Sequence, residues 1–172
     1  MINNDDHALI MLAGHVGSDL IKRGLMLTSA ESCTGGWLGQ AITAKSGSSA
    51  WYERGFITYS VASKQEMLGV STTTLKQYGT VSEQTVKEMV AGALTHSCAQ
   101  VSVAISGVAG PNGGTEGKPV GMVCFAWKMK DGLARSSTHH FDGDRESVRR
   151  QAVSVALQGV IDLVRDAPPI LT

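Results

Sequence analysis

The sequence has few cysteines, few prolines and few aromatic residues. Its 172 residues include three cysteines, four prolines and 5% aromatic residues. The cysteines (Cys33, Cys98 and Cys124) are odd in number and lack CxxC spacing, which argues against a disulfide framework and a zinc site. We therefore expect a protein of a reducing compartment, the cytoplasm.

An excess of charge and a long apolar run are also missing. Fifteen Lys and Arg residues balance fifteen Asp and Glu residues, so we expect neither a nucleic-acid partner nor an anionic membrane partner. No apolar run is long enough to span a bilayer, and the polar start Met1–Asp6 does not resemble a signal peptide. A hydrophobic content of 42% and a charged content of 17% are typical of globular proteins. We expect one domain over 1–172, with an ordered core of about 6–166.

Helical and extended patterns alternate along most of the chain. Apolar spacing and capping residues predict helices over 6–23, 34–45, 61–68, 82–97 and 144–165. Apolar runs predict strands over 25–29, 55–59, 101–105, 122–129 and 133–141. Asp131-Gly132 favours a hairpin between the last two strands. The alternation predicts an α/β fold, a three-layer α/β/α sandwich with a mixed, mostly parallel sheet.

The junction after the first predicted strand reads Thr28-Ser29-Ala30-Glu31-Ser32-Cys33-Thr34-Gly35-Gly36-Trp37. It places the hydroxyl of Ser32 where a strand gives way to a helix. Free N–H groups at a helix start can bind an anion or the oxyanion of an acyl-transfer reaction, so Ser32 is a candidate nucleophile. The simpler interpretation is that Ser32 or Thr34 caps the helix and the glycines form a turn. The junction alone favours that interpretation.

Tyr59 and Lys64 follow the second predicted strand. Because ligands bind at the carboxyl ends of strands in open α/β sheets, Ser32, Tyr59 and Lys64 are expected at one rim. A lysine beside a serine can act as a general base if burial keeps its amine neutral, and a tyrosine can hold the lysine or relay a proton. In an arbitrary chain, a solvated lysine and a half-buried core tyrosine would be the ordinary interpretation.

A glycine-rich loop over 106–121 begins at the same rim with Ser106 and Gly107. It matches neither a Walker phosphate loop nor a GxGxxG fingerprint. Its glycines nevertheless allow the backbone to approach a ligand closely. Long loops in compact domains are often functional, so we favour a functional role over a plain connection.

Arg145 and Arg149 are four residues apart near the start of the last predicted helix, and they share a face of it. Arginine side chains match phosphate geometry well, which makes both candidates for phosphate binding. The alternative is that they are solvated and paired with Asp142, Asp144 or Glu146. Without other observations this alternative is favoured.

Metal and thiol chemistry have little support in the sequence. His139 and His140 are adjacent in a predicted strand, so their side chains point to opposite faces and do not readily chelate one metal. We expect no metal and no cofactor. Cys33 at a helix start is a candidate reactive thiol, but a small buried residue behind Ser32 is the preferred interpretation.

Five segments together are similar to the CinA C-terminal domain family, whose stand-alone members are nicotinamide-nucleotide amidohydrolases. They occur in the family's order over nearly the whole chain, and the first is specific. They are Ala30–Gly36, Gly55–Ser60, Ile105–Pro111, Lys118–Gly121, and Gly143–Arg145 with Val148-Arg149.

The resemblance implies an enzyme of pyridine nucleotide salvage that hydrolyses nicotinamide mononucleotide to nicotinic acid mononucleotide and ammonia. It implies Ser32 as nucleophile, Lys64 as its base and Tyr59 as their support. It also implies a small-molecule nucleotide substrate and a homo-oligomer. Backbone N–H groups of Thr34 to Gly36 are expected to form the oxyanion hole. The residues expected to bind substrate are Glu31, Thr34, Gly35, Gly36, Ser106, Gly107, Arg145 and Arg149.

One segment departs from the family pattern. The family usually reads Tyr-Ser-Asn-Glu-Ala-Lys, whereas this chain has Val61-Ala62-Ser63 before Lys64. Losing a buried amide partner costs about 1–3 kcal/mol, or roughly tenfold to a hundredfold in rate. The alternative hypothesis is therefore a weak or inactive paralogue that binds a nucleotide or acts on another amide.

Overall fold

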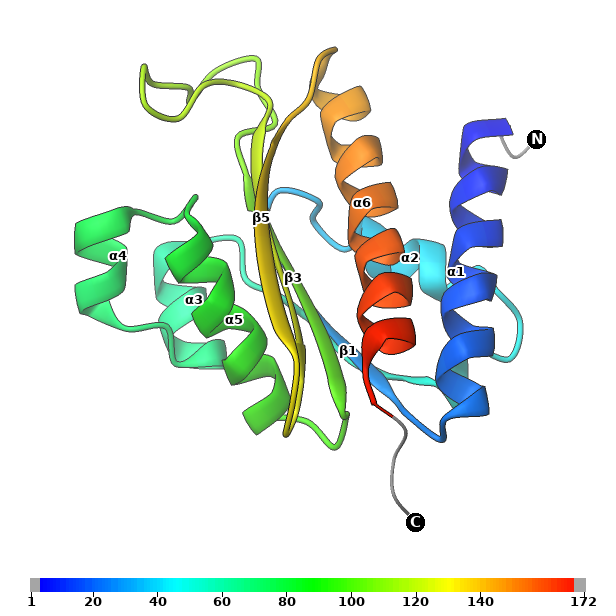
Figure 1. Ribbon diagram of the computed structural model, residues 1–172. Helices are drawn as coiled ribbons and strands as arrows, with labels where there is room; N and C mark the ends of the chain where they lie inside the picture. Colours follow the sequence, from blue (N-terminus) through cyan, green and yellow to red (C-terminus); the bar gives the residue numbers. More distant parts are fainter. Residues whose placement is uncertain (1–3, 169–172) are drawn as a thin grey trace.

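A five-stranded sheet lies between two layers of helices in the computed structural model, which describes residues 4–168 (Figure 1). Met1–Asn3 and Pro169–Thr172, which the predicted domain includes, lie outside the described residues. The strands are β1 Leu27–Glu31, β2 Tyr52–Ile57, β3 Val101–Gly107, β4 Met122–Met129 and β5 Ala134–His140. The helices are α1 Asn4–Lys22, α2 Trp37–Thr43, α3 Val61–Leu68, α4 Thr72–Tyr78, α5 Glu83–Thr95 and α6 Arg145–Asp166, with a 3₁₀ turn at Ser48–Ala50.

The sheet has the strand order β2-β1-β3-β4-β5. β1 pairs in parallel with β2 and β3, whereas β4 pairs antiparallel with β3 and β5. Among these five strands, β4 therefore runs against the other four. Helices α3, α4 and α5 cover one face, and α1, α2 and α6 cover the other (Figure 1). The predicted α/β/α sandwich with a mixed sheet is confirmed.

Strand β1 is buried on both faces of the sheet. Its side chains alternate: Leu27 packs in the core under α1 and α6, and Ala30 packs in the core under α5. The alternation continues past the strand, so that Glu31 faces α2 and Ser32 faces α3. One short strand thus delivers two polar side chains to opposite layers.

The sequence predicted most elements within a few residues of their bounds. The first strand is Leu27–Glu31, two residues later than expected, while α3 and β4 match. Helix α4 was not predicted. None of its residues is buried, so it lacks the apolar periodicity that reveals a helix, although Ser71 caps its start by accepting from the N–H of Thr74.

Gly92 allows α5 to approach α3 closely. A Cβ at Gly92 would lie 1.9 Å from the Leu68 carbonyl oxygen, at the end of α3. Because that neighbour is backbone, it cannot move aside without shifting the helix. The same short helix carries Lys64, so this contact also helps to set the position of the predicted base.

We expect Gly92→Ala to destabilise the protein. Alanine improves helix propensity by about 1 kcal/mol, but a Cβ at 1.9 Å from backbone puts the overpacking cost at the upper end of about 1–3 kcal/mol and displaces α3. Urea unfolding should therefore show a lower free energy of unfolding. Gly117→Ala is the control, because a Cβ there meets nothing within 4 Å. Equal stability of Gly92→Ala and wild type would contradict the proposed contact.

Candidate active site

A cleft of about 240 Å³ lies at the carboxyl ends of β1 and β3. The cleft brings together six of the residues predicted for the site: Ser32, Tyr59, Lys64, Ser106, Gly107 and Arg145. Its other lining residues are Cys33, Thr80, Val81 and Ala109. The remaining predicted residues do not line it: Glu31, Thr34, Gly35, Gly36 and Arg149.

Ser32 and Lys64 are in direct contact. The Lys64 Nζ donates to Ser32 Oγ at 3.0 Å and to the Thr58 carbonyl oxygen at 2.6 Å. Lys64 is only 1% exposed, and among the side chains that the structure describes no carboxylate forms an ion pair with it. Burial without a counter-ion lowers the pKa of Lys64 to about 8, against a weak opposing effect of Cys33. A substantial fraction of the amine is therefore neutral near that pH and able to accept the serine proton.

The start of α3 explains how Lys64 reaches Ser32. Ser60 caps the helix by accepting from the Ser63 N–H at 3.0 Å, and Ser63 Oγ accepts from the Ser60 N–H at 3.1 Å. Lys64 follows on the face that packs against the sheet. Val61 is 50% exposed, and neither Val61, Ala62 nor Ser63 lines the cleft. The departure from the family pattern thus lies outside the cleft wall.

Glu31 organises the start of α2 from within the protein. It is 2% exposed, and its carboxylate accepts from Thr34 Oγ1 at 2.7 Å and from the N–H groups of Leu38 at 2.9 Å and Gly39 at 3.0 Å. A buried acid at a helix start is stabilised by these free donors and by the helix dipole. The carboxylate is thus held by donors of the protein itself, and substrate binding by Glu31 stays a prediction.

The two glycines of the turn do not offer free amides. The Gly35 N–H donates to the Ser32 carbonyl at 3.0 Å, and the Gly36 N–H donates to Glu31 at 3.2 Å. Both glycines have positive φ, which fits their predicted role in a turn. In this structure the protein itself holds the amides of Gly35 and Gly36, and the oxyanion hole at Thr34 to Gly36 stays a prediction. Among the turn residues, the Thr34 N–H makes no hydrogen bond within the described chain, and the Cys33 N–H is engaged only by its own thiol.

Tyr59 and Arg145 meet at the mouth of the cleft. Tyr59 is 63% exposed, and its hydroxyl accepts from Arg145 Nη2 at 3.1 Å. Arg145 Nη1 also donates to the Gly110 carbonyl at 2.7 Å, which ties the glycine-rich loop to the mouth. In this arrangement Tyr59 contacts Arg145 and makes no recorded hydrogen bond to Lys64, so its expected support of the lysine is not direct.

The end of β3 forms the opposite wall of the cleft. Ser106 is buried, and its hydroxyl donates to the Thr80 carbonyl at 2.7 Å. A Cβ at Gly107 would lie 2.7 Å from the Val123 side chain, so glycine permits the close pairing with β4 there. Both residues shape the cleft next to Ser32.

Arg149 points away from the cleft, toward the turn behind it. Its Nε donates to the Cys33 carbonyl and its Nη2 to the Thr34 carbonyl, each at 3.0 Å. Its guanidinium also lies over the Trp37 ring, 5.2 Å from the centroid. Arg149 does not line the cleft, whereas Arg145 does, and the binding of substrate phosphate by Arg149 stays a prediction.

The Cys33 thiol is poorly suited to nucleophilic chemistry. Burial raises the pKa of Cys33 to about 12, although the charges of Arg149 and Lys64 act in the opposite direction. The raised pKa disfavours the reactive-thiol alternative, and the expected burial of Cys33 is confirmed, since its exposed fraction is 6%. Among residues 4–168, no three His, Cys, Asp or Glu side chains converge on a possible metal position.

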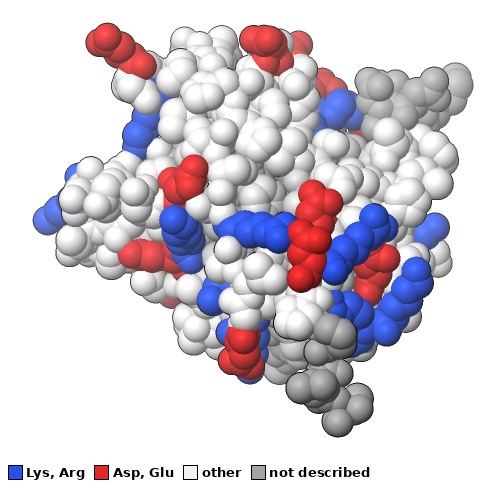
Figure 2. Space-filling view, in the orientation of Figure 1, with Lys and Arg blue, Asp and Glu red and all other residues white. Residues whose placement is uncertain are grey.

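The face seen in Figure 2 carries side chains of both charges. Figure 2 shows Lys and Arg side chains interspersed with Asp and Glu side chains on one face. In the part of the chain that the structure describes, no helix has the length and apolar character needed to cross a membrane.

Sequence reasoning missed the main-chain acceptors of the site. The carbonyls of Thr58, Thr80 and Gly110 hold Lys64, Ser106 and Arg145, as described above. Main-chain carbonyls occur at every residue, so no side-chain pattern could have singled them out. The capping role of Glu31 did have a signal, an acid just before a helix start.

Comparisons with known proteins show the family of the chain. A family model described as the CinA C-terminal domain matches residues 10–164. The nicotinamide-nucleotide amidohydrolase PncC of Escherichia coli K12 is 52% identical over 153 residues, 89% of this chain and 93% of that protein. The Pseudomonas putida protein of the same name is 50% identical, covering 88% and 94%. The crystal structure of the competence/damage inducible protein CihA from Agrobacterium tumefaciens superposes with a TM-score of 0.89 at 41% identity, covering 95% and 98%.

We expect Glu31→Gln to lower the free energy of unfolding by about 1.5–3 kcal/mol, the contribution of hydrogen bonds to a charged group. The amide retains one acceptor oxygen but turns an NH₂ group toward an N–H donor of α2. Urea unfolding measures the loss, and Glu66→Gln on the exposed face of α3 is the matched control. Wild-type stability in Glu31→Gln would show that the α2 start does not depend on the carboxylate.

Proposed function

Because the chain belongs to the CinA C-terminal domain family, we propose that it is a nicotinamide-nucleotide amidohydrolase with Ser32 as nucleophile and Lys64 as base. The observation that carries the proposal is the 3.0 Å contact between Lys64 Nζ and Ser32 Oγ in a buried position. The substrate is nicotinamide mononucleotide, and the products are nicotinic acid mononucleotide and ammonia.

The proposed reaction begins with proton transfer from Ser32 Oγ to neutral Lys64. The Oγ forms a bond to the carboxamide carbon, and the carbonyl oxygen becomes an oxyanion. Protonated Lys64 then gives its proton to the leaving nitrogen, the C–N bond breaks and ammonia departs. Water attacks the resulting ester with Lys64 again as base, which releases the carboxylate and regenerates Ser32.

The size of the cleft suggests that it holds only one part of the substrate. Its volume of about 240 Å³ is below the roughly 300–1,000 Å³ of pockets that enclose drug-sized ligands. The cleft would enclose the pyridine carboxamide, and the sugar phosphate would lie at the mouth. Arg145 and Tyr59 stand there, so Arg145 is the better placed of the two predicted arginines for phosphate.

None of the three residues that depart from the family pattern, Val61, Ala62 and Ser63, lines the cleft. Ser63 takes part in the cap that starts α3, and Lys64 keeps its contact with Ser32. This supports an active enzyme over an inactive paralogue.

As parts of the same proposal, we place the enzyme in the cytoplasm and expect it to self-associate, as the cysteine pattern and the family resemblance suggest.

We expect Ser32→Ala to reduce ammonia release from nicotinamide mononucleotide by about 10³-fold or more, because removing a serine nucleophile leaves only binding and electrostatic effects. Ammonia release at saturating substrate measures it. Ser46→Ala, an exposed serine outside the cleft, is the control and should keep wild-type turnover. Undiminished turnover in Ser32→Ala would remove Ser32 from its role.

We expect kcat/KM to rise tenfold per pH unit below about pH 8 and to level off above it, because only the neutral form of Lys64 accepts the serine proton. Initial rates from pH 6 to 10 measure this profile, with far-ultraviolet circular dichroism confirming the fold at each pH. Lys64→Arg should be inactive throughout, since a guanidinium stays protonated. A profile that is flat from pH 6 to 10 would contradict Lys64 as the base.

A further inference from the structure

The turn after Ser32 is held from behind by one side chain, Arg149. Its guanidinium donates to two successive carbonyls, those of Cys33 and Thr34, each at 3.0 Å. Two bonds from a planar fork to consecutive carbonyls fix the orientation of two peptide planes. The turn that follows the nucleophile is therefore set by a residue of α6, more than a hundred residues later in the chain.

The orientation of these carbonyls determines where the amides point. In a trans peptide the C=O and N–H groups point in opposite directions. The Cys33 carbonyl shares its peptide with the Thr34 N–H, so the bond to Arg149 turns that N–H away from the guanidinium. The Thr34 carbonyl shares its peptide with the Gly35 N–H, which donates to the Ser32 carbonyl at 3.0 Å. That carbonyl in turn orients the Cys33 N–H, and Cys33 lines the cleft.

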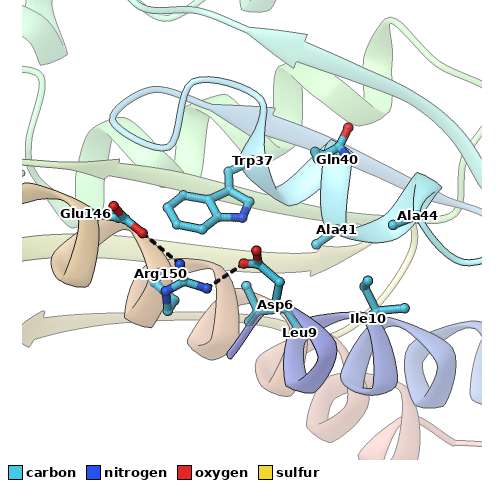
Figure 3. A pocket seen from close by; sticks show the side chains of 9 residues that line it. All are labelled: Asp6, Leu9, Ile10, Trp37, Gln40, Ala41, Ala44, Glu146 and Arg150. Atoms are coloured by element: carbon cyan, nitrogen blue, oxygen red, sulfur yellow. Dashed lines mark hydrogen bonds and ion pairs between the residues drawn. The ribbon is translucent and has the colours of Figure 1, made fainter. Parts of the chain in front are cut away.

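The charge of Arg149 is not matched by an acid. Arg150, its neighbour, pairs with Asp6 at 2.5 Å and with Glu146 at 2.8 Å (Figure 3). Among the side chains that the structure describes, no carboxylate forms such a pair with Arg149. Its positive charge therefore acts on the two peptides and on the Trp37 ring.

A positive charge is useful at this turn because Glu31 lies beneath it. A buried carboxylate would oppose the development of an oxyanion a few residues away. The two opposing influences are visible at Cys33, where Glu31 raises the pKa of the thiol and Arg149 lowers it. Arg149 thus offsets the field of the acid that the α2 start requires.

Building on the proposed function, we propose that Arg149 is a positioning residue for the hydrolysis. Through the Gly35 N–H and the Ser32 carbonyl, it holds the amide of Cys33, which lines the cleft, toward the oxyanion of the tetrahedral intermediate and strengthens that amide electrostatically. It does not bind the substrate phosphate. The interaction operates in the transition state, so its loss lowers kcat and leaves KM nearly unchanged.

The test compares Arg149→Ala with wild type on nicotinamide mononucleotide and on nicotinamide riboside, which has no phosphate. We expect kcat to fall about 10²- to 10³-fold, the range for losing one oxyanion donor, by the same factor on both substrates. KM should change less than about threefold. Ethylguanidinium added to Arg149→Ala should restore part of kcat, which a general loss of stability would not allow.

Arg150→Ala is the matched control. Arg150 follows Arg149 on α6 and lies over the same Trp37 ring, 4.8 Å from its centroid, but it donates to neither carbonyl of the turn. We expect its kcat to stay within about twofold of wild type. Arg149→Lys is the second variant if the alanine variant does not fold. A lysine keeps the positive charge but loses the planar guanidinium that donates to both carbonyls. The kcat of Arg149→Lys should therefore lie between those of wild type and Arg149→Ala.

Three results would overturn the inference: an increase in KM with kcat unchanged, a defect confined to the phosphate-bearing substrate, or equal losses of kcat in the Arg149 and Arg150 variants.

A separate experiment, labelling of Ser32, distinguishes these results from failure of the proposed function. A fluorophosphonate reacts with an activated serine and develops negative charge on its phosphoryl oxygen. If wild type releases no ammonia, the proposed substrate is refuted, and the Ser32 labelling rates decide the role of Arg149. Slower labelling in Arg149→Ala supports it, and equal labelling overturns it.

Discussion

The alternation of side chains at the end of β1 is the constraint on which the site depends. Glu31 faces α2 and accepts the donors of that helix start, while Ser32 faces α3 and meets Lys64. A helix start normally offers its amides to an external anion, but here an internal carboxylate takes them. The amides that remain free are therefore those next to Ser32. Without this buried acid, the free amides at the start of α2 would compete with those next to Ser32 for an anion.

The buried lysine shows what the fold must supply to make a base. A pKa of about 8 in place of 10.5 means that the folded protein holds the Lys64 proton less tightly by about 3 kcal/mol. An acid beside Lys64 would remove this cost but would also keep the amine charged at neutral pH. The fold instead gives the amine one carbonyl and one hydroxyl, and the close packing of α3 on α5 keeps water away.

The sequence was sufficient for the parts of the molecule that periodicity and residue chemistry control. The meeting of Ser32, Tyr59 and Lys64 at one rim followed from their places at the carboxyl ends of strands in an α/β sheet, and the bounds predicted for α3 match the structure. The oxyanion donors could not be predicted in the same way. The choice between the amides of Gly35 and Cys33 depends on which carbonyls and carboxylates reach the turn, and Arg149 arrives there only after the chain has folded.

The two arginines at the start of α6 illustrate why a shared helix face does not mean a shared ligand. Four residues along a helix rise about 6 Å, which separates the mouth of the cleft from the turn behind it. Arg145 at the first position reaches Tyr59 and the glycine-rich loop, whereas Arg149 one turn later reaches Cys33 and Thr34. A single helix therefore ties the rim where substrate enters to the peptides beside the nucleophile. Any shift of α6 along its axis would disturb both at once, so the packing of α6 on α1 and the sheet is part of the site.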